Sequence, residues 1–322
     1  MGFIGSNVAV RLAAAGARVT VVDCADPGCG ANLRNLAEAP EIRIIRADIR
    51  DASAVEGALR GVDVVLNIAG EISHTHSMRN PARDADLNAT AQLYFLEMCG
   101  RVAPGVRVVY AGTRQIYGVP QYLPVDESHP VRPVDFNGIH KHAAVAYHQL
   151  WSDSGKIDAR VLCLTNVYGP RMALNVPGQG FLGSFLRLAL LGETIQVFGD
   201  GRQLRDPVYV DDVVDAFLLA GVTDSPRRLW NVGGASALPL SSIAETISCA
   251  SGAPAPVYCP FPAERKAIDI GSYTTDSSQI RRDLGWRPAV SFEEGIRRTM
   301  EYYRRELAHY VPDRAFAACR RS

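Results

Sequence analysis

No apolar run in the sequence approaches the roughly eighteen residues of a membrane span. The start, MGFIGSNVAVRLAAAGARV, also lacks the basic segment and small-residue cleavage site of a secretory signal, so we expect a cytoplasmic protein. The sequence also has no excess of positive or negative charge, because its 34 basic residues balance its 34 acidic ones. It contains no long block of charge of one sign. This excludes a strong attraction to nucleic acid or anionic lipid and favours a small-molecule partner.

Cysteines are few and carry no metal-binding pattern. The seven cysteines are odd in number, and none forms a CxxC or a Cys/His pair with the spacing of metal ligands. We expect free thiols and no metal site. Lysine is scarcer still, since Lys141, Lys156 and Lys266 are the only lysines among the 34 basic residues. A lysine found at the position of a known catalytic motif is therefore stronger evidence of function than it would be in a lysine-rich sequence.

The first half of the sequence alternates β-branched runs with helical patterns. Helical periodicity covers 88–100, for example, and strands are predicted over 18–23, 41–48, 62–70, 106–112 and 159–169. Short strands alternating with helices are typical of βαβ units. The sequence therefore predicts an α/β protein with a Rossmann-like, doubly wound parallel sheet.

This alternation ends near residue 170, where loops rich in Gly and Pro begin to separate the helical patterns 181–192, 210–222, 240–252 and 292–307. The change predicts a smaller second lobe. We expect residues 1–170 to form the Rossmann lobe, with residues 208–235 or so returning to it, and residues 171–322 to form mainly the second lobe. No low-complexity linker separates the two, so they should pack together.

A glycine-rich segment, Gly2 to Ser6 (GFIGS), runs directly into a helical pattern, and the next predicted strand ends at Asp23. In a dinucleotide site, glycines let the backbone approach a pyrophosphate at a helix N-terminus, and the acid binds ribose hydroxyls. The segment resembles the second half of the TGGxGFIGS loop of extended short-chain dehydrogenases/reductases. Within that group it is similar to the NAD-dependent epimerase/dehydratase family, which modifies nucleotide sugars. The resemblance covers Gly2 to about Tyr303.

The first glycine of that loop and the strand before it are absent from the sequence, although this strand is central in the family's sheet. A sheet without its middle strand would leave two rows of unpaired backbone groups, each costing a few kcal/mol when buried. We therefore expect the natural protein to begin about one strand earlier.

The resemblance implies a set of cofactor contacts. Asp48, with Ile49 beside it, matches the residue that holds the adenine amino group, and Asn88 matches an asparagine near the nicotinamide. Asp23 has no adjacent Arg or Lys and would repel a 2′-phosphate, so the expected cofactor is NAD. The residues assigned to it are Gly2, Phe3, Ile4, Gly5, Asp23, Asp48, Ile49, Ile68, Ala69, Gly70, Asn88 and Lys141.

The catalytic segments resemble the family's with one departure. Thr113 lies where the family's SSxxVYG segment places a hydroxyl on the reacting sugar oxygen, and Lys141 matches the lysine of the YGxSK motif. The tyrosine of that motif is a general acid/base whose pKa the lysine lowers, but its position here is Asn137. An amide cannot transfer the proton, and the loss of a positioned acid/base costs about 10² to 10⁴ in rate.

Three hypotheses follow from this replacement. In the first, His140 handles the proton, because His140 and Lys141 share a helical face with Asn137 and histidine titrates near neutrality. In the second, Asn137 binds the substrate hydroxyl while Thr113 and water transfer the proton. In the third, the chain binds NAD or a nucleotide sugar without turnover. The retained Thr113 and Lys141 favour an enzyme.

The residues after Thr113 narrow the chemistry. Dehydratases of the family carry an Asp-Glu pair there and decarboxylases a Glu, whereas this sequence has Arg114 and Gln115. Epimerisation through a transient keto intermediate is therefore the expected reaction. Dehydration, decarboxylation and net reduction of a nucleotide sugar remain alternatives.

The second lobe is expected to bind a nucleoside diphosphate sugar. Asn166 lies in an NVYGP segment and Arg205 in a segment similar to GdGxxxRDxxyVxD, and both match residues that bind the diphosphate in the family. The pair Arg265-Lys266 before Asp269 resembles the family's RpGD segment, which supplies a further phosphate-binding residue; Arg265 is assigned this role, with Lys266 as the alternative. The resemblance also implies a homodimer.

Overall fold

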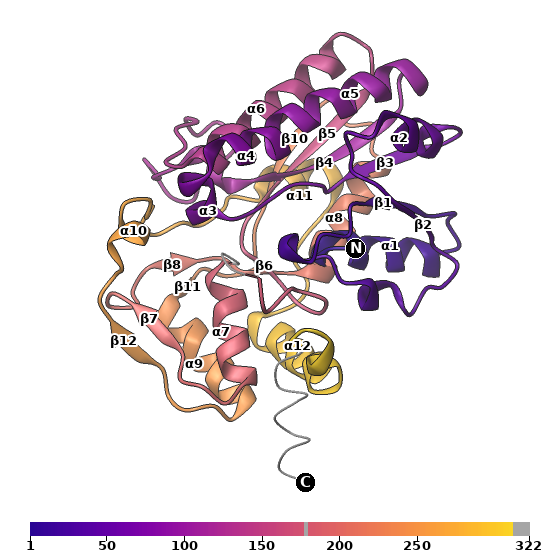
Figure 1. Ribbon diagram of the computed structural model, residues 1–322. Helices are drawn as coiled ribbons and strands as arrows, with labels where there is room; N and C mark the ends of the chain where they lie inside the picture. Colours follow the sequence, from indigo (N-terminus) through magenta and orange to yellow (C-terminus); the bar gives the residue numbers. More distant parts are fainter. Residues whose placement is uncertain (177–179, 312–322) are drawn as a thin grey trace.

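The computed structural model describes residues 1–176 and 180–311, and it contains the parallel α/β sheet that the sequence predicts (Figure 1). Four parallel strands form its main part. In spatial order these are β10 (Leu229–Val232), β5 (Asp158–Leu164), β4 (Arg107–Thr113) and β3 (Val64–Asn67). β5 is buried at every position after its first, and no residue of β4 is exposed, as expected of central strands that are covered on both faces.

A second parallel pair, β1 (Thr20–Asp23) and β2 (Arg43–Arg46), lies beside β3 without a ladder to it (Figure 1). Val22 of β1 and Val65 of β3 nevertheless pack on the same hydrophobic cluster. Among the described residues, the edges of β1 and β3 that are not used by β2 and β4 have no ladder partner. The expected single sheet is therefore divided into two parts.

Helices cover both faces of the sheet. Neighbouring residues of β4 show this, because Val108 faces a cluster under α2 and α5, whereas Val109 faces a cluster under α8. α6 packs on β4 and β5 beside α5, and α1 packs on α8. These helices are α1 (Phe3–Ala14), α2 (Ala52–Leu59), α5 (Ala91–Val102), α6 (Phe136–Asp153) and α8 (Val210–Val222).

The other lobe packs three helices around its own hydrophobic cluster, in which Leu186, Ile243 and Ile296 are fully buried. The helices are α7 (Phe181–Leu190), α9 (Leu240–Ser251) and α12 (Phe292–Glu306). Two-stranded ladders accompany them: β6 (Val167–Tyr168) with β9 (Val208–Tyr209), β7 (Gln196–Phe198) with β12 (Val257–Cys259), and β8 (Leu204–Arg205) with β11 (Leu238–Pro239). The first two are parallel and the last antiparallel.

Several short elements lie outside the predicted pattern. They are α3 (His74–Arg79), α4 (Pro81–Ala85), α10 (Ala263–Lys266), α11 (Ser278–Leu284) and a π-helical turn at Asp86–Thr90. Within the described residues, no helix is long and apolar enough to cross a membrane, and no group of three or more metal-ligating side chains occurs. The six described cysteines are free, and Cys319 lies outside the described residues.

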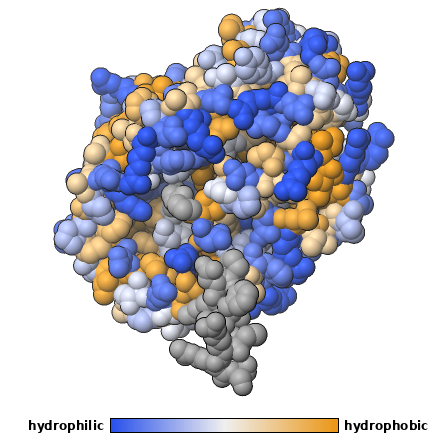
Figure 2. All heavy atoms as spheres, viewed as in Figure 1, coloured by the Kyte–Doolittle hydropathy of each residue, from blue (hydrophilic) through white to orange (hydrophobic). Residues whose placement is uncertain are grey.

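The surface of the divided sheet is partly apolar. In the view of Figure 2, hydrophobic residues gather over the β1–β2 side of the molecule, whereas hydrophilic residues cover much of the remaining face. Ile44 of β2 is 39% exposed. The β1–β2 unit therefore keeps part of its apolar surface in contact with solvent.

Candidate functional site

The glycine-rich segment begins α1. Gly2 is the N-cap of this helix and has an extended backbone, and no side chain caps the first turn. A Cβ added to Gly2 or Gly5 would meet nothing within 4 Å, so packing inside the protein does not require glycine there. Phe3 packs toward the second lobe and Ile4 toward the cluster under α8. The uncapped first turn is open to an anion such as a pyrophosphate.

Asp23 ends β1 close to the start of α1. Its Oδ1 accepts a hydrogen bond from the Ala25 backbone N at 2.7 Å, and its Oδ2 accepts one from the Met1 amino group at 2.5 Å. Carboxylate oxygens have further lone pairs, so these contacts still allow Asp23 to accept ribose hydroxyls. The structure thus brings Asp23 and Gly2 to one end of α1.

Asp48 is engaged by an arginine that the sequence analysis did not consider. Arg50 donates to both carboxylate oxygens, from Nε and Nη2, at 2.8 Å each. This hydrogen bonding lowers the pKa of Asp48. Ile49 is half-buried beside it. An adenine amino group would share the Asp48 carboxylate with Arg50.

The turn after β3 requires glycine at position 70. Gly70 has a φ of +153°, and a Cβ there would lie 2.5 Å from the Lys141 Nζ and 2.7 Å from the Asn88 Oδ1. Asn88 lies in the π-helical turn, a feature that often marks functional sites, and its Oδ1 accepts from the Glu71 backbone N at 3.0 Å. Its Nδ2 is buried and has no partner. Ile68 and Ala69 are half-buried in the same turn.

Lys141 brings an unpaired positive charge to this turn. The side chain is 6% exposed, and the ammonium makes no hydrogen bond to any described residue. Burial lowers the pKa of Lys141 to about 8, while the negative charge of Asp84 acts in the opposite direction. A buried ammonium without an acceptor suits ligand hydroxyl oxygens.

Asn137 and His140 share one buried carboxylate, that of Asp84. The Asn137 Nδ2 donates to Asp84 Oδ2 at 2.9 Å and to the Glu71 carbonyl at 3.0 Å, whereas its Oδ1 is buried without a partner. The His140 Nδ1 lies 2.7 Å from Asp84 Oδ1. Asp84 is 2% exposed and His140 is 15% exposed. The arrangement holds His140 by one ring nitrogen and leaves Nε2 for other partners.

Asp84 is a residue that the sequence analysis missed. It lies in the five-residue helix α4, which is too short to show the apolar periodicity by which a helix is predicted from sequence. Its spacing from Asn88 could have indicated it, because residues four apart lie on the same face of a helix and Asn88 was already assigned to the site.

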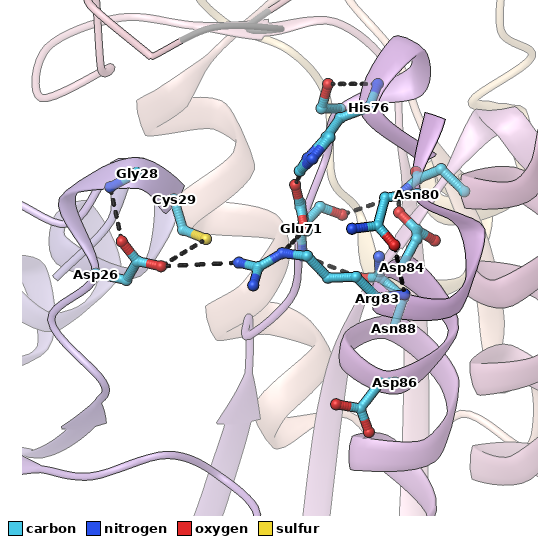
Figure 3. Close-up of polar contacts among 12 residues, drawn as sticks. Asp26, Gly28, Cys29, Glu71, His76, Asn80, Arg83, Asp84, Asp86 and Asn88 are labelled. Carbon is cyan, nitrogen blue, oxygen red and sulfur yellow. Dashed lines mark hydrogen bonds and ion pairs between the residues drawn. The ribbon is translucent and has the colours of Figure 1, made fainter. Parts of the chain in front are cut away.

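Further polar side chains join the ends of β1 and β3 (Figure 3). The Arg83 guanidinium lies between two carboxylates, with Nε 3.5 Å from Glu71 Oε2 and Nη2 3.9 Å from Asp26 Oδ2. The His76 Nδ1 lies 2.6 Å from Glu71 Oε1. These contacts bridge the loop after β1 and the segment that carries Asp84 and Asn88.

Thr113 ends β4 and caps the 3-10 turn Arg114–Tyr117. Its Oγ1 accepts from the Gln115 backbone N at 3.3 Å. The first turn of α6 packs on this segment, because a Cβ at Gly138 would lie 3.0 Å from the Gln115 carbonyl oxygen. Thr113 thus lies beside the start of α6, although it makes no hydrogen bond to Asn137 or His140.

The residues predicted for phosphate binding differ in how they are placed. Asn166 Oδ1 is buried without a partner. Arg205 is 7% exposed, and its Nη1 donates to the carbonyls of Leu204 at 2.8 Å and Gly271 at 2.6 Å, whereas Nε has no partner. Burial, assisted by the charge of Arg114, lowers the pKa of Arg205 to about 10. Arg265 is exposed, and its guanidinium lies 5.2 Å from the Phe198 ring.

A parallel sheet between helical layers, with an uncapped glycine-started helix and polar strand ends at one edge, defines a Rossmann-type nucleotide-binding enzyme. Residues 1–233 match the family described as "NAD dependent epimerase/dehydratase family". The chain belongs to this family.

Relatives match the chain along nearly its whole length. UDP-glucose 4-epimerase of Mycolicibacterium smegmatis is 32% identical over 307 residues, which are 94% of this chain and 96% of that protein. The Thermotoga maritima UDP-glucose 4-epimerase, solved with UDP-glucose, has a TM-score of 0.86 at 31% identity and covers 95% of this chain and 97% of its own. The Thermus thermophilus UDP-glucose 4-epimerase, solved with NAD, has a TM-score of 0.84 at 29% identity, with coverages of 94% and 96%.

Proposed function

We propose that this protein epimerises a nucleoside diphosphate sugar with NAD, through a transient keto intermediate. The observation that carries the proposal is the buried Lys141 ammonium, which has no acceptor and lies against Gly70 and Asn88. A buried unpaired charge is costly, so a position that retains one is a candidate functional site. The named activity of the relatives at about 30% identity supports the same reaction.

The described residues fit NAD. The open first turn of α1 suits the pyrophosphate, and Asp23 suits a ribose at the neighbouring strand end. Lys141 Nζ and Asn88 Nδ2 supply donors that form no hydrogen bond with the described part of the chain. When bound, NAD would supply the acceptor and the donor of the hydride. The protein's own task is then to position the sugar carbon and to move one proton.

We assign the proton to His140, held by Asp84. The Asp84 carboxylate beside Nδ1 fixes the orientation of the His140 ring and its tautomer. Asn137 donates its amide to Asp84 and to a backbone carbonyl, so its role is to position Asp84. Thr113 would hydrogen-bond the reacting sugar oxygen from the other side of the first turn of α6.

The second lobe would hold the diphosphate. Arg205 Nε is a buried donor without a partner among the described residues, Asn166 would donate to the diphosphate from its Nδ2, and Arg265 adds an exposed positive charge. Dehydration and decarboxylation have less support, because Arg114 and Gln115 offer no carboxylate next to Thr113. We place the cofactor on residues 1–170 and the substrate mainly on residues 171–322.

The expected working state is a cytoplasmic homodimer. Exposed large hydrophobic side chains on the adjacent helices α5 and α6 support self-association, since Tyr94 is 53% exposed and Leu150 61%.

Transient NAD reduction tests the function. Mixing the NAD-loaded protein with a panel of nucleotide sugars should give a rise in NADH absorbance that decays as the epimer forms. Arg205→Ala should weaken binding of the active nucleotide sugar by about 1.5 to 3 kcal/mol, the range for charged hydrogen bonds, with NAD binding unchanged. Tight sugar binding without NADH would indicate a non-catalytic binding protein, and equal loss of both ligands in Arg205→Ala would indicate misfolding.

A further inference from the structure

Arg114 lies at the junction between the catalytic segment and the second lobe. It follows Thr113 directly and begins the 3-10 turn after β4. Its guanidinium lies 4.8 Å from the centre of the Tyr273 ring, and Tyr273 is fully buried. The Tyr273 backbone N donates to the carbonyl of Leu204, the residue before Arg205. Arg114 therefore lies between the residue assigned to the sugar and the residue assigned to the diphosphate.

The Arg114 guanidinium has no hydrogen-bonding partner among the residues that the structure describes. It is half-buried, yet none of its five N–H donors forms a hydrogen bond or an ion pair with a described residue. Other enclosed arginines make several hydrogen bonds: Arg107 and Arg160 donate to Asp158 and to backbone carbonyls, and Arg171 donates to Asn7 and to Asn35.

The carboxylates near Arg114 are committed elsewhere. Asp135 accepts from the Gly138 backbone N at 2.7 Å, and its other oxygen lies 2.5 Å from His74 Nδ1. Asp206 accepts from Thr165 Oγ1 at 2.8 Å and from the Thr275 backbone N at 2.9 Å. These two carboxylates act on Arg114 through space, while burial lowers the pKa of Arg114. A half-buried guanidinium whose donors are not used by any described protein group is a receptor for an anion.

Two anions of a nucleotide sugar are chemically suitable, the diphosphate and a carboxylate on the sugar. The diphosphate has its own partners in Arg205 and Asn166. Arg114 is adjacent in sequence to Thr113, whose hydroxyl faces the reacting sugar carbon in the proposed function. An anion beside that carbon belongs to the sugar ring.

We propose that Arg114 binds a carboxylate on the substrate's sugar, so that the protein prefers a nucleoside diphosphate sugar acid to the corresponding neutral sugar. The proposal rests on the proposed function and narrows its substrate class. Because a planar guanidinium can donate two parallel hydrogen bonds to one carboxylate, it discriminates strongly against a hydroxymethyl group at the same place.

Calorimetric binding to the NAD-loaded protein tests this with three probes: UDP-glucuronic acid, UDP-glucose and UDP. The expected result is at least tenfold tighter binding of UDP-glucuronic acid than of UDP-glucose. Arg114→Gln should weaken binding of the sugar acid at least tenfold and leave the other two within twofold. Arg43→Gln, which makes the same change at an exposed arginine of β2, should alter none of them.

The opposite outcomes are distinct. Equal binding of the two sugars by the unaltered protein overturns the carboxylate site, and this comparison needs no variant. Equal weakening of all three probes in Arg114→Gln, with an unchanged melting temperature, assigns Arg114 to the diphosphate and also overturns it. If Arg114→Gln does not fold, Arg114→Lys replaces it, and retained preference for the sugar acid with reduced affinity supports the site. If none of the probes binds the unaltered protein, the proposed function itself fails and the carboxylate site fails with it.

Discussion

The buried charge of Lys141 lowers the stability of the folded protein. Its pKa falls from 10.5 to about 8, a difference that corresponds to roughly 3 kcal/mol. Between these two pH values the unfolded chain holds the proton and the folded chain does not, so stability rises with pH across this window. Below about pH 8 the full cost of the buried charge is present.

Replacing this lysine should therefore separate stability from activity. Lys141→Met is expected to raise the free energy of unfolding at pH 7 by about 1 to 3 kcal/mol, because the desolvated charge is removed. The variant should also lose the rise in stability between pH 8 and 10 and all NAD reduction. Urea unfolding at pH 7 and pH 9.5 measures the first two effects. Lys156→Met, at an exposed lysine, is the control and should change neither.

Asn137 stands where the family has its general acid/base tyrosine, so a substitution there tests whether the family's mechanism applies to this protein. Asn137→Tyr would restore the family motif, and Lys141 is one helical turn away to lower the pKa of the new phenol. We expect hydride transfer to appear or to increase, with a stability loss of about 1 to 3 kcal/mol because Asp84 and the Glu71 carbonyl lose their amide donor. Single-turnover NADH absorbance and thermal melting measure the two effects. A folded variant with no gain in rate would contradict a site that is otherwise intact.

At the scale of elements, the site depends on the contact between α4 and α6. α6 supplies Asn137, His140 and Lys141 from one face, and α4 supplies the single carboxylate that two of them contact directly. The charge of Asp84 also acts on Lys141. A change at Asp84 should therefore alter both the proton acceptor and the lysine.

The pH dependence of the rate tests this coupling. Asp84→Asn removes the negative charge that raises the pKa of Lys141, so the basic limb of the pH–rate profile should move to lower pH. His140→Ala should reduce the rate by about 10² to 10⁴ while NAD binding persists. A profile that is flat from about pH 5 to 9, a span around the ordinary pKa of histidine, would exclude His140 and leave Thr113 with water.

The elements that could be predicted are those with a strong local pattern. The apolar runs of β4 and β5 and the periodicity of α8 predicted the types of these elements, and the bounds of β4 and α8 to within one residue. The predicted strand 159–169 was too long, because β5 ends at Leu164 and Val167–Tyr168 form the separate strand β6. The grouping of Gly70, Asn88 and Lys141 followed from family spacing. Asp84 could not be found in this way, because its helix has five residues and its partners lie on α6, which is distant in sequence. The hydrogen bond of Arg50 to Asp48 likewise depends on side-chain conformation, which the sequence pattern does not predict.

At the scale of the whole molecule, the cofactor residues lie on both parts of the divided sheet. Gly2 and Asp23 belong with β1 and β2, whereas Gly70, Asn88 and Lys141 belong with the four-stranded part. Apart from shared hydrophobic clusters, ion pairs such as Arg83 with Asp26 and Arg50 with Asp86 link the strand ends of the two parts, and exposed ion pairs contribute little.

Amide hydrogen exchange should report this division. Without cofactor, the amides of β1 and β2 are expected to exchange faster than those of β4 and β5, because their ladder has only two strands. NAD should slow exchange in β1 and β2 and leave α9 of the other lobe unchanged, as measured by mass spectrometry of peptides. Equal protection of β1 and β4 in the absence of NAD would show that the two parts open as one unit.

In a chain that begins at Met1, the unpaired edges of β1 and β3 also bear on how the molecule behaves in concentrated solution. An open strand edge is a template for pairing with another chain, and natural proteins usually cover or charge such edges. Here two edges lie beside each other, with apolar side chains on the adjacent surface. Intermolecular strand addition is therefore expected to begin at this place when the β1–β2 unit opens. A bound cofactor that holds the unit closed would act against aggregation as well as for catalysis.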